Sequence, residues 1–178
     1  MTTSLSNDRL LKAARILTTI FMVLTAIACV GLVVAMPVVL LSQSHVAEIM
    51  LPTANSSLGG VLGAIMIVLL CGAAIMALAF SFLRLLRQMI NTVGEGDPFI
   101  LENAERLHKM GWIAVSVELA KIPAGAMVIF LASQLETDKL QVDLEFSFTG
   151  LLVALVLFIL ARVFRRGAEM REDLEGTV

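Results

Sequence analysis

Glu118 and Lys121 are the charged side chains that could do chemistry inside an otherwise apolar stretch of this sequence. They stand three positions apart, so a helix would place them on one face, where they can form an ion pair. A charge at the centre of a bilayer costs about 2.5–3.5 kcal/mol on insertion scales, which makes unpaired exposure to lipid unfavourable. Two interpretations stay open: a structural ion pair, which we favour, and a ligand or ion pathway.

Two further residues belong to this predicted intramembrane polar site. Pro123 has no N–H to donate to the carbonyl group of Leu119, which leaves an acceptor free near Lys121. Arg162, close to the end of the last apolar stretch, is a second candidate partner for Glu118. A kinked, charged spot of this kind is typical both of a solute pathway and of a structural ion pair.

The composition requires a membrane to position these residues. The chain of 178 residues is 58% hydrophobic and only 16% charged, with a mean hydropathy of +0.93. A soluble core of this size cannot bury so much apolar surface. We therefore predict an all-α fold, a single integral membrane domain over residues 1–178 built as a four-helix bundle. Long apolar runs place the transmembrane helices at about 16–41, 58–83, 112–133 and 147–166.

Lysine and arginine predict the orientation of these helices. Eleven of the thirteen basic residues flank the predicted spans on one side: Arg9, Lys12, Arg15, Arg84, Arg87, Arg106, Lys109, Arg162, Arg165, Arg166 and Arg171. Cytoplasmic loops carry the excess of basic residues, so both termini and the loop 84–111 are predicted to be cytoplasmic. The basic residues are spread over three segments and interleaved with acids, which favours contact with the anionic inner leaflet over direct binding of nucleic acid.

The loop 84–111 is the most patterned part of the chain. Two glycines and the Asp97-Pro98 pair predict a tight turn, after which Phe99 would anchor the chain at the membrane interface. Apolar residues then recur at helical spacing and predict an amphipathic helix over about 99–110, lying along the inner leaflet. This loop is either a structural connector or a docking surface for a cytoplasmic partner.

Motifs for catalysis or metal binding are absent from the sequence. His45 and His108 are predicted on opposite sides of the membrane, where they cannot share a metal, and each is expected to be a solvated or interfacial side chain. We therefore expect no enzymatic activity, no metal and no cofactor. The G-x-x-x-G pair Gly59 and Gly63 is interpreted as packing within the monomer, with a homo-oligomer interface as the alternative.

Two stretches of the sequence resemble signatures of one bacterial family. The first is Gly96-Asp97-Pro98-Phe99 followed by Glu102-Asn103-Ala104, and the second is the tail from Val163 to Met170. Together they resemble DUF2975, a family of small membrane proteins of unknown function, along the whole chain. The resemblance implies four helices, a multi-pass location in the bacterial inner membrane and no known activity. Members are often encoded beside a small helix-turn-helix regulator.

From this resemblance we expect a non-enzymatic sensor or tether for a cytoplasmic transcriptional regulator. The alternative is a small transporter or channel subunit whose polar pathway passes Glu118 and Lys121. The residues predicted to dock the regulator are Asp97, Pro98, Phe99, Glu102, Asn103, Arg106, Phe164, Arg165, Arg166 and Gly167.

Overall fold

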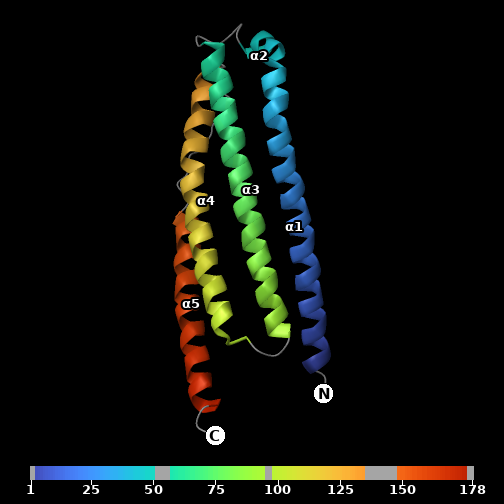
Figure 1. The fold of residues 1–178 in the computed structure, drawn as a ribbon, viewed down its shortest axis with the longest axis vertical. Coiled ribbons are helices and arrows are strands. Elements are labelled where there is room, and N and C mark those ends of the chain that lie inside the picture. Colours follow the sequence, from blue (N-terminus) through green and yellow to red (C-terminus); the bar gives the residue numbers. More distant parts are fainter. Residues whose placement is uncertain (1–2, 51–56, 95–97, 135–147, 176–178) are drawn as a thin grey trace. The chain divides into compact units, whose positions relative to one another are not determined.

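The computed structural model is all-helical in the residues that it describes, which are 3–50, 57–94, 98–134 and 148–175. Asp97, one of the predicted docking residues, lies outside them. The helices are α1 (Thr3–Leu41), α2 (Gln43–Met50), α3 (Leu58–Gly94), α4 (Leu101–Gln134) and α5 (Phe148–Glu175) (Figure 1).

Four of these helices are long and apolar enough to cross a membrane, which confirms the four helices predicted from the sequence. The qualifying segments are Leu10–Leu41, Leu58–Gly94, Leu101–Gln134 and Phe148–Leu174. The short helix α2 was not expected. A single residue, Ser42, separates it from α1. The N–H groups of Ser42 and Val46 bond to the carbonyl groups of Val38 and Ser42 at 3.0 and 3.1 Å. Helical hydrogen bonding therefore bridges the break at Ser42.

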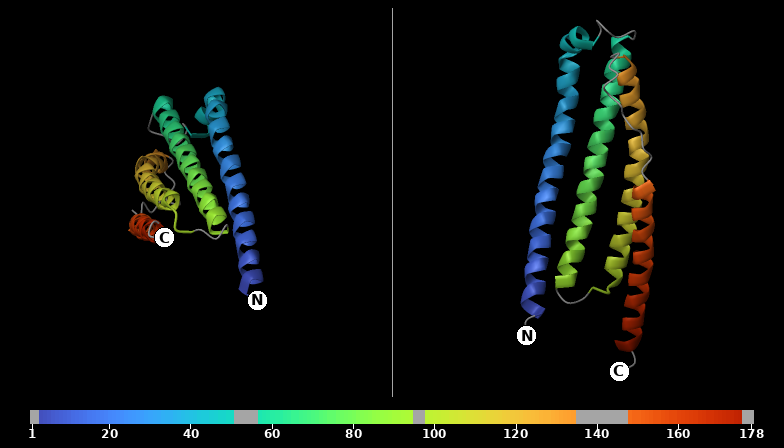
Figure 2. Two further views of the ribbon diagram at one scale, coloured as in Figure 1. Left: turned by 60° about the horizontal axis from the view of Figure 1, so that its bottom comes forward. Right: turned by 180° about the vertical axis from the view of Figure 1, so that it is seen from behind.

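The prediction of a separate amphipathic helix at about 99–110 is wrong. That segment is the first part of α4, which runs without interruption from Leu101 through Trp112 to Gln134 (Figure 2). On the other side of the connection, α3 continues past the predicted end of its span to Gly94. Bending the chain near Trp112 would leave backbone groups without helical partners, whereas a continuous helix satisfies them.

The described contacts divide the chain into two compact units. Unit 1 consists of residues 1–25, 78–116 and 147–178, and unit 2 consists of residues 26–77 and 117–146.

In unit 1, α3, α4 and α5 share an apolar core. Leu107 and Met110 of α4 and Leu157 and Ala161 of α5 are its buried centre. Their spacings of three and four residues place each pair on one helix face. The partly buried residues packed around them are Phe82, Leu85, Leu86, Met89, Ala114 and Phe164.

In unit 2, the close contacts between helices lie at Ala73 and Gly72. The Cys29 thiol lies 3.6 Å from the carbonyl oxygen of Ala73, and a methyl group added to Gly72 would lie 3.3 Å from Leu32. By contrast, a methyl group added to Gly59 or Gly63 would meet no described atom within 4 Å. Among the described residues, nothing therefore packs directly on this G-x-x-x-G pair.

Candidate functional site

The two signature stretches contact each other in unit 1. The Phe99 ring packs on the Phe164 ring, with centroids 5.2 Å apart and planes inclined by 39°. It also lies over Gly167, where an added Cβ would be 2.9 Å from Phe99 Cδ1. Gly167 is thus a point of close approach between α5 and the connection that precedes α4. Phe99, which we expected to contact the membrane interface, packs in part on α5.

Asn103 holds this connection in place. Its side chain is completely buried, and its Nδ2 donates to Thr92 Oγ1 at 2.8 Å and to the Pro98 carbonyl oxygen at 2.9 Å. Arg106 Nη1 donates to Asn103 Oδ1 at 2.7 Å. One amide therefore links the end of α3, Pro98 and the first turns of α4, with both of its donor hydrogens and its acceptor in use.

These contacts separate the predicted docking residues into two kinds. One kind takes part in the local contacts described above and is buried or half-buried: Pro98, Asn103, Arg106, Phe164 and Gly167. The other kind is exposed: Phe99, Glu102, Arg165 and Arg166. Asn103 in particular is not accessible to a partner, although its polar character made it resemble a surface residue in the sequence.

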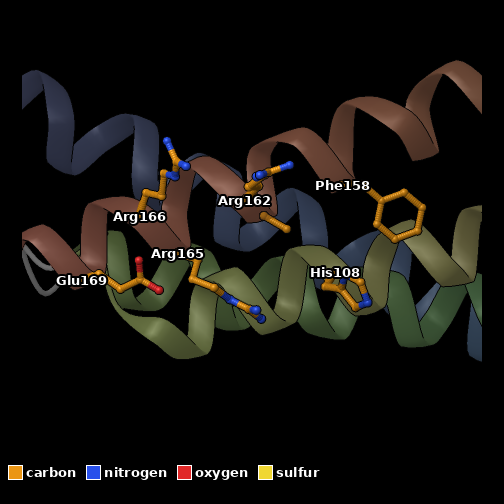
Figure 3. Close-up of a pocket in the computed structure, with 7 residues that line it drawn as sticks. His108, Phe158, Arg162, Arg165, Arg166 and Glu169 are labelled. Carbon is orange, nitrogen blue, oxygen red and sulfur yellow. The ribbon is translucent and has the colours of Figure 1, made fainter.

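A groove of about 420 Å³ runs along α4 and α5 in unit 1 (Figure 3). We call it the α4–α5 groove; it is lined by His108, Phe158, Ala161, Arg162, Arg165, Arg166 and Glu169. Three arginines against one glutamate give the lining residues a net charge of +2, with His108 left out of the count. Among the described residues, no carboxylate lies within 4.0 Å of the three guanidinium groups.

An aromatic cluster forms one end of the α4–α5 groove. Trp112 Nε1 donates to His108 Nε2 at 3.2 Å, so the neutral imidazole carries its proton on Nδ1. The Phe158 ring meets both residues edge to face, at centroid distances of 5.2 Å from His108 and 5.7 Å from Trp112. This cluster was not predicted from the sequence. The four-residue spacing of His108 and Trp112 was its one available signal.

The predicted pairing of Glu118 and Lys121 is confirmed in unit 2. Lys121 Nζ lies 2.7 Å from Glu118 Oε1, and the two side chains are 50% and 8% exposed, respectively. Each buried side-chain nitrogen or oxygen among the described residues has a hydrogen-bond partner. Pro123 lies exposed within α4, and Arg162, the other predicted partner, lines the α4–α5 groove of unit 1.

Neither a metal site among the described residues nor a characterised relative indicates a function. The described residues contain no group of three or more His, Cys, Asp or Glu side chains that could hold a metal ion. A sequence model of the family described as "Protein of unknown function (DUF2975)" matches residues 61–178. The match begins within α3, so it is shorter than the whole-chain resemblance that we expected. No curated protein and no solved structure matches the chain.

Proposed function

This chain belongs to the DUF2975 family of proteins of unknown function, and from that premise we propose that it is a non-enzymatic membrane sensor or tether for a small cytoplasmic regulator. The observation that carries the proposal is the packing of Phe99 on Phe164 and Gly167. It joins the two signature stretches, far apart in the sequence, at one place in unit 1. A single partner can therefore contact both stretches at once.

The docking surface that we propose lies on the extension of α5. At 1.5 Å per residue this helix of 28 residues is about 42 Å long, whereas the hydrocarbon core of a bilayer is about 30 Å thick. Its last turns therefore extend into water. There Met170 and Leu174 are 67% and 70% exposed, and their spacing of four residues places them on one face.

Two large apolar side chains side by side in water favour a protein partner. The regulator that fits would present an apolar helix face to Met170 and Leu174. The family resemblance supports a helix-turn-helix regulator encoded beside this chain as that partner.

Co-purification from membranes tests this proposal. We expect the wild-type chain to retain the neighbouring regulator and the Met170→Ser/Leu174→Ser variant to lose it. The control is Glu169→Ser/Glu172→Ser, which changes two exposed residues of the same helix turns and should retain the regulator. Failure of the wild-type chain to bind the regulator, or equal binding by all three chains, would refute the proposal.

The second candidate is a small transporter or channel subunit. It is favoured by one observation, the buried Glu118 carboxylate bonded to Lys121 inside an apolar segment of α4. In proteoliposomes this candidate predicts proton- or solute-dependent flux that Glu118→Gln removes and that Glu105→Gln, at an exposed position nearer the start of α4, leaves intact. A structural ion pair predicts no flux in any of the three chains.

A further inference from the structure

We propose that the α4–α5 groove binds the phosphate headgroup of an acidic phospholipid. Three features of the groove support this proposal, which does not depend on a protein partner. They are the position of the groove along the two helices, its guanidinium groups and its apolar end.

The depth of the groove in the bilayer can be inferred independently from each helix that lines it. On α5, Arg162 is the first charged residue after the apolar run that starts at Phe148. On α4, Trp112 begins the apolar run, and His108 lies one turn before it. Tryptophan is enriched where hydrocarbon gives way to headgroups. Both helices therefore place the groove at the depth of lipid phosphates.

The arginines of the groove have the chemistry that phosphate requires. Arg162, Arg165 and Arg166 all line it from α5, and Figure 3 shows Arg165 extending across α4 on the side of His108. A guanidinium group is planar and can donate two parallel hydrogen bonds to one phosphate. The three groups have no carboxylate partner within 4.0 Å among the described residues, so this donor capacity is available to a ligand.

The other end of the groove suits the glycerol and acyl part of a lipid. Phe158 and Ala161 line the groove beneath the arginines, and Trp112 packs against Phe158. Next to them on α5, Leu155 and Ile159 are exposed apolar residues. A water-soluble phosphate would use only the arginines, whereas a phospholipid uses the arginines and the apolar surface together. This is why we assign the groove to a lipid and not to a free anion.

Trp112 makes the assignment measurable because it is the single tryptophan of the chain and lies beside the groove. The full-length protein is reconstituted in phosphatidylcholine bilayers that contain a small fraction of lipid brominated on its acyl chains, either phosphatidylglycerol or phosphatidylcholine. Bromine quenches tryptophan emission only at short range. Stronger quenching by the brominated phosphatidylglycerol therefore reports its enrichment beside Trp112.

We expect about fivefold to tenfold preference for phosphatidylglycerol in the wild-type chain, and loss of that preference in Arg165→Gln/Arg166→Gln. The matched control, Arg84→Gln/Lys109→Gln, removes two exposed positive charges of unit 1 that do not line the groove and should keep the preference. Equal quenching by both lipids in the wild-type chain, or an equal loss of preference in both variants, would overturn the proposal.

Two further measurements keep the result unambiguous. Inorganic phosphate, added at constant ionic strength, should not displace the brominated lipid; displacement would show a free-phosphate site and overturn the assignment to lipid.

If the glutamine variant fails to insert, Arg165→Lys/Arg166→Lys replaces it. Lysine keeps the charge but lacks the planar pair of donors, so we expect part of the preference to be lost, and an unchanged preference would overturn the proposed recognition by guanidinium groups.

Discussion

Asn103 illustrates how a single residue acquires its role from three partners. Its amide bonds to Thr92, Pro98 and Arg106 while it is completely buried. Asn103→Ala would leave these groups without that partner, and we expect it to lower the free energy of unfolding by about 1–3 kcal/mol. The thermal unfolding midpoint in detergent measures the loss. Asn91→Ala, at a half-buried position on α3, is the control, and an equal decrease in both variants would contradict the prediction.

His108 and Trp112 form a hydrogen-bonded pair on α4. His108 Nε2 accepts the indole N–H of Trp112 at 3.2 Å, and a leucine side chain offers no acceptor in its place. Trp112 emission should therefore differ between the wild-type chain and His108→Leu.

The emission of this one tryptophan is compared between three variants and the wild-type chain. His108→Gln keeps a hydrogen-bond acceptor, so its emission should stay closer to that of the wild-type chain than the emission of His108→Leu. His45→Leu, on α2, should behave like the wild-type chain. Equal emission from His108→Leu and the wild-type chain would contradict the predicted role of the His108 acceptor.

At the scale of helices, glycine determines how closely α4 and α5 approach in unit 1. An added Cβ on Gly111 would lie 2.8–3.0 Å from three carbons of the Phe158 ring. We expect Gly111→Ala to lower the free energy of unfolding by about 1–3 kcal/mol, because the ring or the helix must move. Gly63→Ala, where the added carbon meets no described atom within 4 Å, should leave stability unchanged or raise it by up to about 1 kcal/mol.

A double variant separates this contact from a general effect of the substitution. Phe158→Leu shortens the side chain that Gly111→Ala meets, so the double variant should recover part of the stability that Gly111→Ala loses. Simple addition of the two single losses, measured as unfolding midpoints in detergent, would show that the Gly111 contact with Phe158 is not the cause.

The helices also show where local sequence patterns mislead. Residues 99–110 have the amphipathic spacing of an interfacial helix, yet they continue into Trp112 as part of α4. The apolar face of that segment packs Leu107 and Met110 against Leu157 and Ala161 of α5. An amphipathic pattern indicates that one face is buried, but it does not say whether lipid or another helix covers that face.

At the scale of the whole molecule, the prediction concerns the orientation of the helices in the membrane. The distribution of basic residues predicts that both termini are cytoplasmic. An alkaline phosphatase reporter, which is active only in the periplasm, should be inactive after Val178 and active between α2 and α3. The same reporter between α4 and α5 should also be active. Activity after Val178 would place the α5 extension on the other side of the membrane and remove the proposed docking surface.

The sequence by itself determined the four apolar helices, the family and the pairing of Glu118 with Lys121. All three depend on local properties: the length and hydropathy of a segment, a contiguous motif, and a spacing of three residues on one helix. The intrinsic geometry of a helix is enough to interpret them.

Only the tertiary structure decided that Asn103 is a buried link, that Phe99 covers Gly167, and that three arginines line a groove with His108. These contacts join residues of different segments of the chain. Which residues meet depends on the register of one helix against another. That register follows from how ridges, glycines and aromatic rings of two helices fit together, and no single stretch of sequence encodes it.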